Sequence, residues 1–309
     1  MTSEELNNYI RGGIVNEVIR VAEARQVKRL SHIADEICAR KTVRLVLVCG
    51  ASAAGKTTTA KRICTQLMVN DRFALHLSTD DYFVGDKRNP RDENGNLDYE
   101  HVECVDIPRL AEDIEALLRG ESVPRRRFDF VNHEPVYPDE TVTLRPGGIV
   151  VLEGIHALNP RLTESIGDAL KYRLFIEPQP DLDIFGGITP SSSDARFLRR
   201  MVRDNQFRKM SPLATVELWP GVLAGERKWI DPFRGHADAT FNSYLIYELA
   251  ALKPYVGGLL ELARLALGDG NRQVMNMIRL LKAVEPISPE AVPGDSILRE
   301  TIGGSQLEY

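Results

Sequence analysis

The sequence Gly50-Ala51-Ser52-Ala53-Ala54-Gly55-Lys56-Thr57-Thr58 fits the phosphate-loop (P-loop) pattern, in which Gly and four further residues precede Gly-Lys-Ser/Thr. Small residues let the backbone turn so that successive N–H groups point at phosphate oxygens. A helix that begins within the loop adds the positive end of its dipole. In this pattern Lys56 reaches the β- and γ-phosphates, and the Thr57 hydroxyl binds Mg²⁺. Residues 50–58 therefore predict a nucleotide site that takes ATP and Mg²⁺.

The residues on either side of the loop give the order strand, loop, helix that a P-loop requires. A short apolar run typical of a buried parallel strand precedes it: Val43, Leu45, Leu47 and Val48. Apolar residues at helical spacing follow it: Ala60, Ile63, Leu67 and Met68. An ordinary Gly/Ala-rich turn is the alternative, and the order of the flanking elements disfavours it.

Strands and helices alternate along the rest of the chain. We expect strands at 43–49, 73–78, 148–152, 172–176 and 237–241. We expect helices at 56–69, 106–119, 194–207 and 243–266. This alternation predicts an α/β fold with a parallel sheet flanked by helices, of the P-loop NTPase type found in nucleoside and nucleotide kinases. Ligands of such sheets bind beyond the C-terminal ends of the strands.

Composition and charge limit the partners of the protein. The chain has 39 Lys and Arg against 44 Asp and Glu, a net charge of −5, and this balance argues against a nucleic-acid surface. Four cysteines have no metal-binding spacing and indicate reduced thiols: Cys38, Cys49, Cys64 and Cys104. No apolar run reaches the length of a membrane span, and the polar N-terminus is unlike a signal peptide. We expect a cytoplasmic protein without a membrane partner.

Two carboxylates follow predicted strands, at the edge of the sheet where ligands bind. Asp80, in the sequence Ser-Thr-Asp-Asp-Tyr-Phe over 78–83, could accept a proton from a substrate hydroxyl or hold Mg²⁺ through water. Glu153 ends an apolar run over 150–152 and could help to organise Mg²⁺. The alternatives are structural, because Ser-Thr-Asp-Asp is also a good capping sequence and Glu-Gly is a common turn. The neighbouring P-loop favours a functional role for both carboxylates.

An arginine-rich segment over 194–209 offers groups for the phosphates. As a helix it places four arginines on one face: Arg196, Arg199, Arg200 and Arg203. Guanidinium groups clamp the oxygens over which phosphoryl transfer spreads negative charge. The alternative is a solvated amphipathic helix that turns Phe197 and Met201 inward. Both interpretations are open at this point.

Two loops carry candidate residues for a phosphate acceptor. The segment Phe128-Asp129-Phe130-Val131-Asn132-His133 could stack against a flat base and hydrogen-bond to it. Asp98 could accept hydrogen bonds from two ribose hydroxyls. A loop histidine and an exposed loop aspartate are also common as solvated residues, so neither identifies a ligand by itself.

Together these motifs resemble the uridine kinase branch of the phosphoribulokinase/uridine kinase family. The resemblance extends over residues 42–265 and rests on an ordered set of segments: 50–58, 78–83, 96–98, 128–133, 152–154 and 199–204. Three further segments, 219–221, 241–243 and 296–304, resemble a bacterial-type subgroup. In that subgroup the kinase domain often follows a TGS module and a synthetase-like module, which are absent from this sequence.

The resemblance implies a division of the chain and a set of roles. We expect an N-terminal helical extension (1–41), a P-loop kinase domain (42–284) with a lid around 186–235, and a C-terminal tail (285–309). The implied catalytic residues are Lys56, Asp80, Arg200 and Arg203. The implied substrate residues are Asp98, Phe128, His133, Arg200 and Arg208. The implied metal ligands are Thr57, Asp80 and Glu153, and the nucleotide would bind to the loop over 50–58.

The resemblance predicts ATP-dependent phosphorylation of the 5′-hydroxyl of uridine or cytidine. Phe128 stands where uridine kinases usually carry Tyr, and Met210 stands where a further Arg is often found. Another small hydroxylated metabolite, such as a sugar phosphate or a pantothenate-like alcohol, is therefore an alternative acceptor. A non-catalytic nucleotide-binding protein is a second alternative, which the intact Lys56, Asp80 and Glu153 disfavour. Family members are often homo-oligomers, and no heptad pattern bears on this here.

Overall fold

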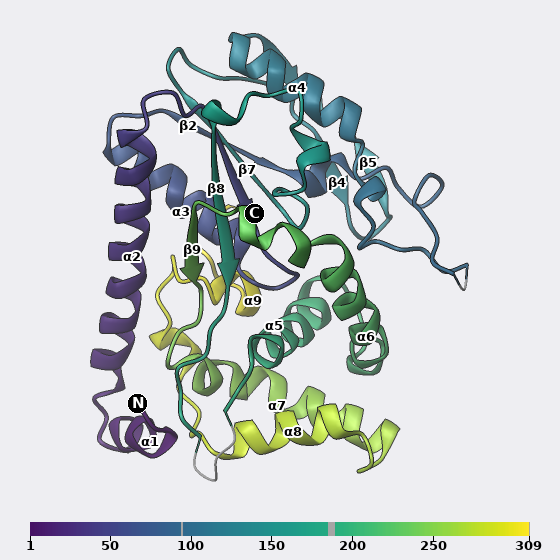
Figure 1. The fold of residues 1–309 in the computed structure, drawn as a ribbon. Helices are drawn as coiled ribbons and strands as arrows, with labels where there is room; N and C mark the ends of the chain where they lie inside the picture. The colour runs from purple at the N-terminus through teal and green to yellow at the C-terminus, as the bar shows by residue number, and fades with distance from the viewer. Residues whose placement is uncertain (94, 185–188, 309) are drawn as a thin grey trace.

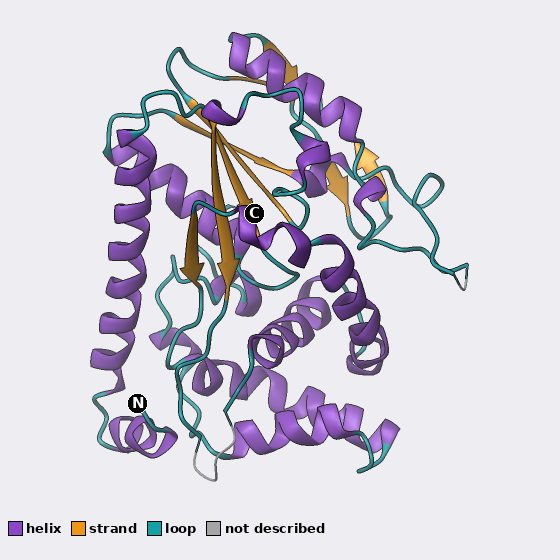
Figure 2. Ribbon diagram, viewed as in Figure 1, coloured by secondary structure: helices purple, strands orange, loops and turns teal. Residues whose placement is uncertain are grey.

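The structure is a computed structural model that describes residues 1–93, 95–184 and 189–308. Its centre is a sheet of five parallel strands (Figure 1; Figure 2). In spatial order the strands are β2 (Ala74–Ser78), β7 (Ile149–Gly154), β1 (Leu45–Cys49), β8 (Lys171–Glu177) and β9 (Ala239–Asn242). The apolar strands β1 and β7 are buried along their whole length, as a sheet covered on both faces requires. The predicted parallel sheet is confirmed.

Apolar helix faces cover the two sides of this sheet. Three helices form the two covering layers, α2 (Val15–Ala39) and α3 (Lys56–Val69) on one face and α4 (Ile107–Arg119) on the other. Ile33 and Ile37 recur at helical spacing in α2 and belong to the same buried cluster as Val46 and Val48 of β1. Helices therefore hold the central strand β1, from which the P-loop continues, on both faces of the sheet.

A second, helical layer lies beyond the C-terminal ends of β8 and β9 (Figure 1). Its helices are α1 (Ser3–Arg11), α5 (Ser192–Phe207), α6 (Pro212–Trp229), α7 (Glu248–Leu267), α8 (Arg272–Lys282) and α9 (Arg299–Ile302). They surround an apolar core of their own, which includes Phe197, Trp219, Leu252 and Leu280. Within the described ranges, none of the helices is both long and apolar enough to cross a membrane.

Two small antiparallel sheets of two strands each follow α4 in the chain. They pair β3 (Ser122–Pro124) with β6 (Thr141–Thr143), and β4 (Arg127–Asp129) with β5 (Glu134–Val136). Strands of three residues carry too few alternating positions to be recognised in a sequence. The β4–β5 hairpin lies on the right of Figure 1. Its first strand holds Phe128 and its turn holds His133, so these two predicted acceptor residues belong to a small folded element.

Some predicted elements differ from those observed, for local reasons. The helix predicted at 243–266 begins at Glu248 instead. Strand β9 runs to Asn242, and Ser243, the next residue, donates from Oγ to the carbonyl of Ala54 in the P-loop over 2.6 Å. Neither α6 nor α8 was predicted, and α6 contains Pro220 and two glycines, which usually interrupt helices. The start of the lid predicted around 186–235 lies outside the described residues.

Candidate active site

The P-loop turns tightly between β1 and α3. Ala53 and Gly55 have φ angles of 61° and 88°, in the left-handed region that glycine adopts without strain. Gly50 has no room for a side chain, because a Cβ there would collide with the carbonyl oxygen of Ile176 on β8. These glycines give the loop the curvature that a cradle of N–H groups needs.

A buried arginine of α5 holds the P-loop from outside. The guanidinium of Arg199 forms two hydrogen bonds of 2.6 Å with the carboxylate of Glu248, and both side chains are at most 3 % exposed. Its Nη1 also donates to the carbonyl oxygens of Ala53 and Ala54, over 3.4 and 3.3 Å. Because Ser243 donates to the same Ala54 oxygen, the loop is tied both to α5 and to the connection between β9 and α7.

Two further arginines of α5 reach Ser52 at the tip of the loop. Arg196 Nη1 donates to the Ser52 carbonyl over 3.4 Å, and Arg200 Nη1 donates to the Ser52 hydroxyl over 2.9 Å. Arg196 also pairs with Glu226 of α6 at 2.7 Å. Both arginines are buried. The arginine face of α5 is therefore packed against the P-loop and is not a solvated surface.

Asp204 orients the remaining arginines of this segment. It is fully buried and pairs with Arg203 at 2.7 Å, with Arg200 at 3.1 Å and with Arg208 at 3.8 Å. Burial acts to raise the pKa of Asp204, but the three guanidinium groups hold it below its usual value. The ionised Asp204 thus keeps three positive charges together beside the loop.

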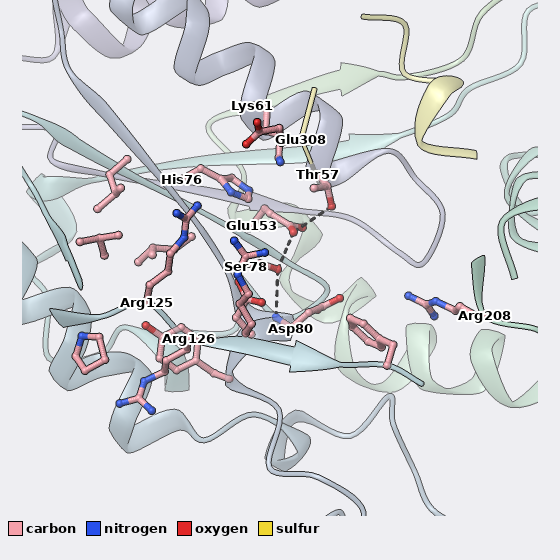
Figure 3. Close-up of a pocket in the computed structure, with 18 residues that line it drawn as sticks. Thr57, Lys61, His76, Ser78, Asp80, Arg125, Arg126, Glu153, Arg208 and Glu308 are labelled. Carbon is pink, nitrogen blue, oxygen red and sulfur yellow. Dashed lines mark hydrogen bonds between the residues drawn. The ribbon is translucent and has the colours of Figure 1, made fainter. Parts of the chain in front are cut away.

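Four polar residues from three strand ends form a connected chain (Figure 3). Thr57 Oγ1 and Ser78 Oγ both donate to Glu153 Oε1, over 3.1 and 2.7 Å. The Asp80 N–H donates to Ser78 Oγ over 3.2 Å. Glu153 is 3 % exposed, and burial, together with the nearby charge of Asp80, raises its pKa. A bound cation would lower this pKa again, so the buried carboxylate fits a site for positive charge.

These side chains fit a Mg²⁺ ion in their chemistry. Mg²⁺ is usually held by one or two carboxylates, by water and by substrate phosphates. The Thr57 hydroxyl and the Glu153 carboxylate are hard oxygen donors in mutual contact, and Asp80 follows in the short 3-10 turn Thr79–Tyr82. Lys56, whose Nζ donates to the Ala51 carbonyl over 3.3 Å, begins the same helix as Thr57.

A cavity of about 660 Å³ opens beside these residues. Thr57, Asp80 and Glu153 line it, and Arg208 closes it from the opposite side (Figure 3). The Arg208 guanidinium stacks on the ring of Phe130 at 4.6 Å. Burial, followed by the charge of Arg203, lowers the pKa of Arg208 to about 10, so this arginine stays charged at neutral pH. The cavity thus places a cation opposite the two acidic groups.

Of the predicted acceptor residues, Arg208 lines the cavity, whereas its lining does not include the other four: Asp98, Phe128, His133 and Arg200. The Asp98 carboxylate accepts the N–H of Glu100 over 3.0 Å. His133 Nδ1 is hydrogen-bonded to the hydroxyl of Tyr99 at 3.0 Å. Among the described residues no hydrogen bond joins Asp98 to Arg200. The ring of Phe128 packs edge-on against other aromatic rings, so a base would approach an existing aromatic cluster.

Sequence reasoning missed several residues of the cavity. Lys61 lies one helical turn after Thr57 in α3 and lines the same cavity, and this spacing of four residues could have identified it. Arg125 and Arg126 come from the connection between β3 and β4, and Glu308 comes from the C-terminal tail. No local pattern links these three residues to the P-loop, because tertiary packing brings them there.

Comparison with known proteins gives matches at the level of sequence and of structure. The model of the Phosphoribulokinase / Uridine kinase family matches residues 45–248, more than half of the chain. A uridine kinase from Lactobacillus helveticus is 25% identical over 195 residues, which cover 63% of this chain and 83% of that protein. A uridine kinase from Halobacterium salinarum is 28% identical over 192 residues, covering 62% and 76%.

One solved structure shares the fold. It is a protein from Silicibacter sp. TM1040 described as a fructose transport system kinase, with a TM-score of 0.52 and 20% sequence identity. The superposition covers 69% of this chain and 98% of that one. At this identity the similarity speaks for the kinase-like α/β fold alone.

Proposed function

Because this chain belongs to the Phosphoribulokinase / Uridine kinase family, we propose that it transfers the γ-phosphate of ATP to the 5′-hydroxyl of uridine or cytidine. Family membership and the uridine kinases among its relatives make the chain a phosphotransferase of the P-loop kinase type. The nucleoside acceptor, the roles of single residues and a cytoplasmic location form the proposal. Four unpaired cysteines favour that location.

The observation that carries the proposal is a chain of hydrogen bonds from Thr57 through Glu153 and Ser78 to the backbone N–H of Asp80. Thr57, Glu153 and Asp80 line one cavity. Lys56 and the N–H groups at the start of α3 would hold the phosphates of ATP. Mg²⁺, when bound at Thr57 and Glu153, would neutralise charge on the phosphates. These groups position the donor, and positioning with electrostatic stabilisation supplies most of the catalysis in phosphoryl transfer.

Asp80 would accept the proton of the attacking hydroxyl. Asp80 lines the cavity, and an acceptor bound there would have its hydroxyl between Asp80 and the donor phosphate. Arg200, Arg203 and Arg208, gathered by Asp204, would stabilise the charge that spreads over the transferred group. Asp98, Phe128 and His133 would bind the ribose and the base.

The test of this function is ADP release with ATP and Mg²⁺ against a panel of acceptors. The panel contains the common nucleosides and small alcohols such as sugar phosphates and pantothenate, and each product is identified by its mass. We expect uridine or cytidine to gain one phosphate. Activity confined to a non-nucleoside alcohol would replace the acceptor and keep the mechanism. ATP binding without turnover on any acceptor would contradict a catalytic role.

The role of Asp80 is tested by replacing it with asparagine. Asp80→Asn removes the proton acceptor at constant size, so we expect kcat to fall by about 10²- to 10⁴-fold while ATP affinity is kept. Asp81→Asn, the same change at the next residue of the cavity lining, is the matched control and should lower kcat far less. Equal effects of both variants would remove Asp80 from its proposed role.

A further inference from the structure

The C-terminal segment 296–308 packs directly on the P-loop. Ile297 is 3 % exposed, and a Cβ added to Gly55 of the loop would collide with its side chain. Glu308 lines the cavity together with Thr57 and Glu153 (Figure 3). The helix α9 of this segment therefore sits beside the first turn of α3, the place where the phosphates of a nucleotide bind.

Glu300 of α9 already occupies hydrogen-bond donors of that turn. One of its carboxylate oxygens, Oε2, accepts the hydroxyl of Thr58 over 2.7 Å and the N–H of Thr58 over 3.3 Å. Thr58 follows Lys56 and Thr57, and its N–H is one of the first-turn donors that the helix itself cannot satisfy. A negative group is thus bound where the positive end of the α3 dipole attracts an anion.

The position of Glu300 is built into the segment and does not depend on a loose surface side chain. Arg299, its neighbour, donates from Nη2 to the carbonyl oxygens of Val292 and Pro289, over 2.5 and 3.0 Å. Its Nη1 donates to the carbonyl of Gly303 over 3.2 Å. The buried Ile297 and these three bonds hold α9 from both ends, so Glu300 is aimed at Thr58 by the fold.

We propose that Glu300 is a further residue of the phosphate-binding site, which holds the N–H and hydroxyl of Thr58 until a phosphate group of the nucleotide takes them. The inference rests on the proposed function, because it requires a nucleotide on the P-loop. The carboxylate and the phosphate compete for the same donors and repel each other, so Glu300 weakens the binding of phosphorylated nucleotides. By linkage, a bound phosphate weakens the docking of Glu300 to the same extent.

The test compares the affinity of ADP, ATP and adenosine for the full chain by isothermal titration calorimetry. Glu300→Gln removes the charge at constant size, and we expect it to bind ADP and ATP about tenfold more tightly. The affinity for adenosine, which has no phosphate, should not change. Glu300→Ala is the second variant and should act in the same direction. Glu290→Gln, an exposed carboxylate of the same tail, is the matched control and should bind like the wild type.

The outcomes separate this inference from the proposed function. Unchanged or weaker ADP binding in both Glu300 variants, with a wild type that binds ADP, would overturn the role of Glu300 alone. A gain that is equal for adenosine and ADP would also overturn it, because the effect would not depend on phosphate. Binding by the variants and not by the wild type would support it. If none of the proteins bound ADP or ATP, both the inference and the proposed function would be wrong.

Discussion

The buried pair between Arg199 and Glu248 makes the sharpest prediction about stability. Glu248→Gln keeps the size of the side chain and removes its charge, which leaves the guanidinium of Arg199 without a counter-ion. Both side chains are at most 3 % exposed and share two hydrogen bonds of 2.6 Å. Removing one partner of such a pair costs about 3–5 kcal/mol of unfolding free energy. We expect a loss of about 3 kcal/mol, since glutamine keeps one acceptor.

The assay is equilibrium unfolding in urea, followed by circular dichroism, together with the thermal midpoint. A loss of this size lowers the midpoint by about 5 °C in a chain of this length. Glu261→Gln is the matched control, because Glu261 also forms two hydrogen bonds to one arginine, Arg264, but at the exposed surface. We expect no measurable change there.

A second variant separates the charge from the support of the P-loop. In Arg199→Met/Glu248→Leu no buried charge is left unpaired, so most of the stability should return. The carbonyl oxygens of Ala53 and Ala54 still lose the hydrogen bonds from the guanidinium. We therefore expect the double variant to bind nucleotide more weakly than the wild type. A loss below about 1 kcal/mol in Glu248→Gln, or a double variant that binds nucleotide like the wild type, would refute this reasoning.

Two further predictions concern pH and the fit of α6. His156 is 1 % exposed, and burial lowers its pKa to about 4. The unfolded chain therefore binds the extra proton between pH 6.5 and 4, and the protein should lose about 2 kcal/mol of stability from this group between pH 7.5 and 5. The loss of unfolding free energy between the two pH values, measured in urea, should be smaller by this amount in His156→Gln. The same pH dependence in the variant and the wild type would contradict the effect of burial. A Cβ at Gly225 of α6 would collide with the Cβ of Glu100, so Gly225→Ala should lower the thermal midpoint and raise the KM for the acceptor. Gly221→Ala, in the same helix with open space around it, should do neither. Equal behaviour of the two variants would contradict a close contact between α6 and the segment that contains Glu100.

The part of the fold that could be predicted from the sequence is the part fixed by local patterns. The apolar runs before Gly50 and Glu153 are buried strands of one sheet, because their side chains have nowhere else to avoid water. Helix α6 was missed because Pro220 and the glycines near it disfavour a helix, and its buried face, including Trp219, compensates in the folded protein. Local propensity is a weak guide where packing decides.

The candidate site shows the same division. Thr57, Asp80 and Glu153 were named from strand ends and loop patterns, and the structure brings them into one cavity. The arginine segment could be interpreted in two ways from the sequence. The pattern does not show that Arg200 contacts Ser52 of the P-loop or that Arg203 pairs with the buried Asp204. Glu300 lies 242 residues from Thr58 along the chain, and no spacing rule connects positions so far apart.

Helix α2 contributes to two of the apolar cores of the molecule. Val18 and Ile19 near its start belong to the core of the helical layer, whereas Ile33 and Ile37 near its end belong to the core under the sheet. Because α2 is one continuous helix, its displacement from one of these cores would also disturb its packing in the other. The region that matches the family begins only at residue 45, yet its sheet is sealed by this helix. We therefore expect the unit that unfolds cooperatively to extend beyond the region of sequence similarity, with the sheet and the helical layer coupled through α2.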